Sequence, residues 1–287
     1  MNENPVVSVL GLGLLGASFC MALEGKYRRA GWSRNPDNRK KALEKGVVEY
    51  TVDTPEEAFA AGDIIVLCLP IPVITEYIRK YARHMKPGAV LTDIGSVKGV
   101  IEKAAAEVEG LHFIGSHPMA GTEKNGFDHA FKGLYTNADV FIVPPSGAEE
   151  QDIRRIETLW QDIGTRTTRI DSEEHDELVA GTSHVPHILA SATTLSVLDV
   201  PEEERIIRFS GCATGFRDSS RVASSSAVMW REIVEQNVPA VLTALSELRR
   251  HLDEYENMIR LGDFNGFEKK FSRGKMLRDQ WLRWKKY

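Results

Sequence analysis

The sequence has few cysteines, no long apolar run and no excess of positive charge. Its three cysteines are widely spaced and form no Cys-x-x-Cys pair, which excludes a disulfide-rich scaffold and favours reduced thiols in a cytoplasmic protein. The longest apolar run, 64–74, contains two prolines and is shorter than the roughly 20 residues that a membrane helix needs. No basic stretch precedes an apolar one at the N-terminus, so no signal peptide is expected. A net charge of −5 argues against nucleic-acid binding.

Strand-like and helix-like segments alternate over the first 170 residues. Hydrophobic residues make up 42% of the 287-residue chain, enough for a folded protein whose length suggests two domains. Strands are expected at 6–10, 29–33, 63–69, 89–94, 112–115 and 140–143. Helices are expected up to residue 23 and at 36–45, 55–61, 74–85 and 97–108. This alternation predicts an α/β fold with a doubly wound parallel sheet.

A glycine motif stands where the first strand meets the first helix. Gly11, Gly13 and Gly16 follow the pattern Gly-x-Gly-x-x-Gly, with Leu14 and Leu15 between the last two. In this context the pattern predicts a dinucleotide site. The first glycine permits a tight turn, the second lets the backbone approach a pyrophosphate, and the third allows close packing of helix on strand. N–H groups at the start of the helix would bind the phosphates.

The second half of the chain has a different pattern. From residue 171 helical periodicity dominates, with helices expected at 173–198, 202–209, 217–226, 228–260 and 263–284. We therefore predict a dinucleotide-binding Rossmann domain at 1–170 and an all-helical substrate-binding and dimerisation domain at 171–287. The long amphipathic helices have no sheet to cover and favour a homodimer.

Ligands of open α/β sheets bind beyond the carboxyl ends of the strands, so the residues at those ends are candidates. Leu69 and Pro70 form a rigid apolar turn suited to flank a cofactor. Five polar residues at the next strand ends should gather near a nicotinamide: Ser96, Lys98, His117, Thr122 and Glu123. His117 is suited to accept a proton from an alcohol during hydride transfer. Ser96 is a second partner of that alcohol or a helix N-cap, and Lys98 belongs to the site or lies on the surface.

The end of the second strand bears on the choice between NAD and NADP. An NAD-preferring site carries Asp or Glu there, about 20 residues after the glycines. Ser33 and Arg34 occupy this position and offer a hydroxyl and a guanidinium to a 2′-phosphate. Asp37 is a counter-candidate, but it is expected in the first turn of the next helix, where an acid suits the helix dipole. The sequence therefore predicts NADP, with NAD as the alternative.

The helical half contributes a second polar group, made of His184, His187, Gly215, Arg221 and Trp230. Arg221 offers a planar fork for a carboxylate, unless it forms an internal salt bridge with a residue such as Asp218. The two histidines are three residues apart, but no further metal ligands stand at a suitable spacing. We therefore expect no metal site.

Six short stretches together resemble the prephenate/arogenate dehydrogenase family of tyrosine biosynthesis. They lie at 11–18, 93–99, 117–123, 183–187, 215–221 and 229–231, in the family's order. The stretches beginning at His117 and Ser183 are far more specific than the glycine motif. The resemblance implies a Rossmann domain, a helical domain that interlocks two subunits, and the oxidative decarboxylation of prephenate to 4-hydroxyphenylpyruvate with hydride transfer to NAD(P).

The resemblance also implies roles for single residues. His117 would accept the hydrogen bond and the proton of the ring hydroxyl, with Ser96 assisting at the same oxygen. Arg221 would bind the ring carboxylate. His187 would contact the pyruvyl side chain, and because a donor there suits a keto acid, prephenate is expected in preference to arogenate.

Four more residues lie in the matching stretches. Glu123 would belong to an ionic network that gates the pocket, and Trp230 would approach from the partner subunit. Thr122 and Gly215, which lie in the matching stretches 117–123 and 215–221, are also counted among the substrate-binding residues.

Two other classes of protein share this architecture. β-Hydroxyacid dehydrogenases and imine reductases usually carry a catalytic lysine on a long interdomain helix, and no lysine stands between Lys132 and Lys269. A dinucleotide-sensing regulator without catalysis is a non-enzymatic alternative. The joint presence of Ser96, His117 and Arg221 argues against it.

Overall fold

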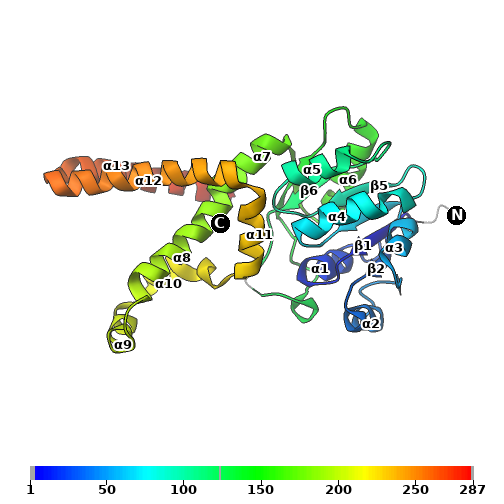
Figure 1. Ribbon diagram of the computed structural model, residues 1–287, viewed down its shortest axis with the longest axis horizontal. Coiled ribbons are helices and arrows are strands. Elements are labelled where there is room, and N and C mark those ends of the chain that lie inside the picture. The colour runs from blue at the N-terminus through cyan, green and yellow to red at the C-terminus, as the bar shows by residue number, and fades with distance from the viewer. Residues whose placement is uncertain (1–3, 123, 286–287) are drawn as a thin grey trace. The chain divides into compact units, whose positions relative to one another are not determined.

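A computed structural model describes residues 4–122 and 124–285 (Figure 1). The chain divides into two compact units, the first ending at Val238 and the second beginning at Pro239. This division differs from the proposed domain boundary at 170/171, which rests on the change of sequence pattern. No helix of the described part is long and apolar enough to cross a membrane.

A five-stranded parallel sheet of order β3-β2-β1-β4-β5 forms the centre of the first unit (Figure 1). Its strands are β1 (Val6–Leu10), β2 (Arg28–Trp32), β3 (Tyr50–Thr51), β4 (Ile64–Leu67) and β5 (Val90–Asp93). The helices that follow them are α1 (Leu14–Ala22), α2 (Pro36–Glu44), α3 (Pro55–Ala61), α4 (Ile71–Tyr81) and α5 (Gly99–Ala106). This is the predicted Rossmann-type sheet, with β3 in addition.

The sheet is buried on both faces because alternate residues of its strands enter two separate apolar clusters. Val66 of β4 packs into a cluster that includes Phe19 of α1 and Trp160 of α6 (Glu150–Asp162). Ile65, its neighbour in the strand, packs into a cluster with Ile74 and Ile78 of α4. Near-continuous apolar strands are what a sheet covered on two faces requires.

A second sheet departs from the prediction of one continuous parallel sheet. It contains β6 (Gly115–Pro118), β7 (Asp139–Val143) and β8 (Arg166–Arg169), and β6 runs antiparallel to β7. A single bridge between Leu91 and Phe113 links it to the first sheet. Strand β8 was not predicted because its four residues are all polar. Helix α6 was not predicted either, although its apolar residues have helical spacing.

Helices alone form the rest of the first unit. They are α7 (Ser172–Val179), a π-helical turn (Ala180–His184), α8 (Val185–Leu198), α9 (Glu202–Gly211), α10 (Thr214–Ser220), a 3-10 turn (Arg221–Ser224) and α11 (Ala227–Gln236). The single helix expected at 228–260 is wrong, because the helix is interrupted at Asn237. The buried amide of Asn237 instead donates to the carbonyl of Asp176, 2.8 Å away.

The second unit is an antiparallel pair of long helices, α12 (Val238–Leu261) and α13 (Phe264–Lys285). Gly262 makes the turn between them with φ +71°, and the rings of Tyr255 and Phe267 pack edge to face across the pair. Large apolar side chains remain exposed on both helices, among them Leu242, Ile259, Phe271 and Trp284. Exposed apolar surface of this extent is typical of an interaction surface.

Candidate active site

The glycine turn after β1 has the shape of a dinucleotide cradle. Gly11 has φ +105°, and a Cβ on it would lie 2.0 Å from the carbonyl oxygen of Cys68. A Cβ on Gly16 would lie 2.0 Å from the carbonyl oxygen of Gly11. A Cβ on Gly13, by contrast, would meet no atom within 4 Å. The outer glycines are therefore required by the fold, whereas Gly13 leaves space where a pyrophosphate can approach the backbone.

The start of α1 faces the same space. Leu14 is the first residue of the helix, Leu15 the second, and the cap residue Gly13 supplies no side-chain hydrogen bond to the first turn. Leu69, in the loop after β4, lies against Gly11, and Pro70 caps α4. The residues around the turn thus fit a nucleotide phosphate held by backbone N–H groups.

No carboxylate directly follows β2. Ser33 is buried, and its carbonyl accepts a hydrogen bond of 2.6 Å from Arg39. Arg34 is exposed beside it. Asp37 lies in the first turn of α2, where its backbone N–H donates to the cap residue Asn35, as the sequence predicted.

His117 lies in β6 and heads a buried chain of hydrogen bonds. Its Nδ1 is 2.9 Å from Nε2 of His175, and Nδ1 of His175 is 2.8 Å from the Asp176 carboxylate. Burial lowers the pKa of His117 well below its usual value of 6.5, and the charges of His175, Lys98 and His184 lower it further. The imidazole is therefore neutral at physiological pH, the form that accepts a proton.

Neither His175 nor Asp176 was predicted from the sequence. His175 stands in α7, 58 residues further along the chain than His117. It is followed by Asp176, and both lie among acidic residues of the kind common on a solvated helix face. The sequence feature that could have identified them is a histidine next to an aspartate. This pair of residues is too common in proteins to predict a catalytic role.

Lys98 is buried, so its interpretation as a surface residue is wrong. Its ammonium group forms an ion pair with Asp93 and donates to the carbonyl oxygen of Ser116, 2.9 Å away. Burying a charge is costly unless it is paired, and Asp93 meets that requirement. Lys98 thus fixes the backbone immediately before His117.

Ser96 lies half-buried in the loop between β5 and α5. The helix begins at Gly99 with Lys98 as its cap residue, so the interpretation of Ser96 as the N-cap is wrong. Its place after the end of β5 leaves the role beside the substrate hydroxyl as a proposal.

His187 and Trp230 form the centre of the second polar group. Nδ1 of His187 is 2.8 Å from the carbonyl oxygen of Ser183, and its ring stacks on Trp230 of the same chain. Trp230 therefore reaches this group without a partner subunit. Burial lowers the pKa of His184 to about 4, and no described residue bonds its Nε2 or the indole N–H of Trp230.

The remaining candidates lie at the surface of this region. Arg221 begins the 3-10 turn and is exposed, and its charge contributes to the lowered pKa of His187, which burial mainly causes. Asp218 pairs with Arg217 at 3.0 Å. Thr122 is exposed, with its hydroxyl accepting from the N–H of Lys124, and Gly215 is exposed in α10. Glu123 lies outside the described residues.

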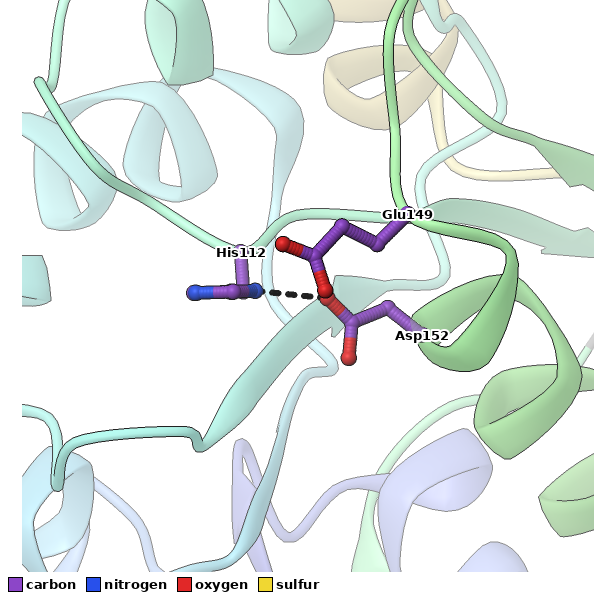
Figure 2. Close-up of side chains that lie close together, drawn as sticks. All are labelled: His112, Glu149 and Asp152. Carbon is purple, nitrogen blue, oxygen red and sulfur yellow. Dashed lines mark hydrogen bonds and ion pairs between the residues drawn. The ribbon is translucent and has the colours of Figure 1, made fainter.

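A separate cluster of possible metal ligands lies on the N-terminal side of β6 (Figure 2). His112, Glu149 and Asp152 offer ligand atoms within 4.8 Å of one another. Nδ1 of His112 is 2.6 Å from Asp152, and Arg155 lies 3.6 Å from the other oxygen of that carboxylate. The contacts of Asp152 with His112 and Arg155 fasten α6 to the segment that leads into β6.

Two family descriptions match the chain. Residues 24–169 match "Prephenate dehydrogenase, nucleotide-binding domain", and residues 171–273 match "Prephenate dehydrogenase, dimerization domain". The chain is 31% identical to a cyclohexadienyl dehydrogenase of Zymomonas mobilis, with 88% of each chain covered. It is 30% identical to a prephenate dehydrogenase of Lactococcus lactis, covering 95% of this chain and 76% of the relative.

A solved structure agrees with these matches. Prephenate dehydrogenase from A. aeolicus, in complex with hydroxyphenyl propionate and NAD+, superposes with a TM-score of 0.89 at 26% identity, covering 98% of this chain and 99% of the other. The chain belongs to the prephenate dehydrogenase family. It is an oxidoreductase with prephenate dehydrogenase activity, and the predicted fold class, a nucleotide-binding sheet domain followed by a helical dimerisation domain, is confirmed.

Proposed function

We propose that this prephenate dehydrogenase uses His117 as its catalytic base. The dinucleotide, when bound, accepts the hydride from ring carbon C4. His117 takes the proton of the C4 hydroxyl, so that C4 becomes a ketone. Loss of the ring carboxylate as CO2 leaves its electron pair in the ring and gives a phenolate, which takes the proton back from His117. The supporting observation is a neutral, buried imidazole bonded through His175 to a carboxylate.

Prephenate is the proposed substrate, with arogenate as the alternative. One relative carries the name prephenate dehydrogenase, and another carries the broader name cyclohexadienyl dehydrogenase. Arg221 is proposed to bind the ring carboxylate and His187 the side chain that distinguishes the two substrates. Ser96 is proposed to assist at the hydroxyl.

The other candidates are proposed to complete the substrate pocket. Thr122, Glu123, Gly215 and Trp230 are assigned to it by their place in the family's motifs. The fold alternatives outside the family, a β-hydroxyacid dehydrogenase, an imine reductase or a dinucleotide sensor, have no supporting observation here.

NADP is the proposed cofactor, with NAD as the alternative, because Ser33 and Arg34 stand where an NAD-binding acid would stand. The solved structure of the A. aeolicus relative contains NAD+, so binding of a nicotinamide dinucleotide is known in the family.

Association of two subunits through the helical region is proposed from the dimerisation-domain match and the exposed apolar side chains of α12 and α13. The three free cysteines suit a reducing compartment such as the cytoplasm.

The direct test follows NAD(P)H formation with prephenate and with arogenate, in wild type and in His117→Asn. The variant should lose about 10²- to 10⁴-fold in kcat, the scale of a positioned general base. Its Kd for the dinucleotide should be unchanged. A variant with wild-type kcat would exclude His117 as the base.

A further inference from the structure

The hydrogen bonds around His117 have a fixed direction. An ionised carboxylate only accepts hydrogen bonds, so Nδ1 of His175 must donate to Asp176. A neutral His175 then has a lone pair on Nε2, which accepts the bond from Nδ1–H of His117, 2.9 Å away. It follows that Nε2 of His117 carries the lone pair and is the nitrogen that can take a proton.

Several hydrogen bonds hold Asp176, the last residue in the series that starts at His117. One oxygen also accepts from the backbone N–H of Lys98 at 2.7 Å, and the other accepts from the N–H of Gly99 at 2.8 Å. Both N–H groups belong to the start of α5, where the helix dipole favours a negative charge. These two bonds hold the carboxylate in place as the acceptor for His175.

The two imidazoles are also held by packing. His175 is fully buried, and its ring packs edge to face on His117 with centroids 5.1 Å apart and on Phe141 with centroids 5.7 Å apart. Rotation of either ring would break a buried hydrogen bond, which costs about 1–3 kcal/mol. The titratable groups that face the pair are Asp176, Lys98, Asp93 and His184.

We propose that His175 and Asp176 are positioning residues that keep His117 in the one tautomer able to accept the substrate's proton. This proposal rests on the proposed role of His117 as the base. It adds that His175 and Asp176 of α7, and not the substrate, determine which ring nitrogen of His117 is protonated.

The tautomer can be read directly in the free wild-type enzyme. Nitrogen NMR of ¹⁵N-histidine-labelled protein distinguishes a protonated from an unprotonated ring nitrogen, and the spectrum of His117→Asn identifies the signals of His117. Protonated Nδ1 with unprotonated Nε2 is the expected result. A protonated Nε2 overturns the proposal even if His117 proves essential, and this measurement does not depend on the substrate.

A pair of variants tests the function of the hydrogen bonds that link His117, His175 and Asp176. His175→Gln can still present an oxygen to Nδ1–H of His117, whereas His175→Leu cannot accept. His175→Leu should lose about 10-fold or more in kcat, the scale for removing a hydrogen-bond partner that orients a histidine, with unchanged Kd for the dinucleotide. His175→Gln should recover most of this loss and retain the wild-type tautomer. Equal kcat values for the two variants would assign His175 a packing role only and overturn the proposal.

Discussion

His187 stacks on Trp230 with ring centroids 3.9 Å apart and ring planes inclined by 29°. With Nδ1 committed to the carbonyl of Ser183, the neutral ring presents Nε2 as an acceptor and not as the donor expected from the sequence. His187 becomes a donor at Nε2 only when protonated. Burial, with the charge of Arg221, lowers its pKa, so the acceptor form prevails at neutral pH.

Because Nε2 of His187 is an acceptor in the neutral ring and a donor in the protonated ring, the choice of substrate should depend on pH. The keto group of prephenate needs a donor, and the ammonium group of arogenate needs an acceptor. The ratio of kcat/KM for prephenate to that for arogenate should therefore rise as the pH falls below the ordinary histidine pKa. Effects on His117 cancel in this ratio because both substrates need the base. His187→Leu should give a pH-independent ratio, and a wild-type ratio that does not change with pH contradicts the assigned role.

Replacement of Arg221 tests binding of the ring carboxylate. Arg221→Ala should weaken prephenate binding by about 1.5–3 kcal/mol, the range for a hydrogen bond to a charged group, with little change in dinucleotide affinity. Arg231→Ala is a matched control, because Arg231 is also exposed and forms an ion pair along its own helix, 3.6 Å from Glu235. Titration calorimetry of both variants separates the outcomes. Equal weakening of the two ligands by Arg221→Ala would indicate a structural residue.

Replacement of Arg34 tests the cofactor assignment. Arg34→Ala should lower kcat/KM for NADP by about 10-fold or more, because a charge-assisted bond to the 2′-phosphate is lost, and should leave the value for NAD unchanged. Arg28→Ala is the control, since Arg28 is exposed at the opposite end of β2, where it pairs with Glu49. Wild-type preference for NAD, or an NADP preference that survives the substitution, would refute the assignment.

The buried histidines predict a loss of stability in mild acid. His117, His175 and His184 all have lowered pKa values in the folded protein, chiefly because of burial. Below pH 6.5 the unfolded chain binds protons that the folded chain does not, so the free energy of unfolding should fall as the pH drops from about 6.5 towards 4. Urea unfolding at pH 7.5, 6 and 5 measures this slope. His184→Gln should make it shallower, and an unchanged slope would show that His184 does not contribute.

The sequence was sufficient where local geometry determines function. Gly16 is required by a contact to Gly11 within the same turn, and Gly11 has a positive φ, so their spacing alone predicts the nucleotide cradle. His117 was predicted as a candidate from its expected place after a strand; the structure places it within β6, and its role as the base stays a prediction. Lys98 was misjudged because its burial depends on Asp93 across a loop, which residue type does not reveal.

The sequence was insufficient where partners come from distant elements. His175 reaches His117 only because α7 packs beside β6 and β7, and the antiparallel pairing of β6 could not be read from the four residues of that strand. The place of Trp230 against His187 depends likewise on the approach of α11 to α8. Such contacts depend on tertiary structure and produce no periodic pattern in the sequence.

The chain of bonds from His117 to Asp176 crosses from one family domain to the other. His117 lies within the nucleotide-binding match at 24–169, and its two partners lie within the dimerization match at 171–273. The nucleotide-binding domain taken alone would keep the glycine cradle but lose the two groups that we propose to orient His117. We therefore expect that a chimera of two relatives joined between the domains needs a compatible histidine–aspartate pair to remain active.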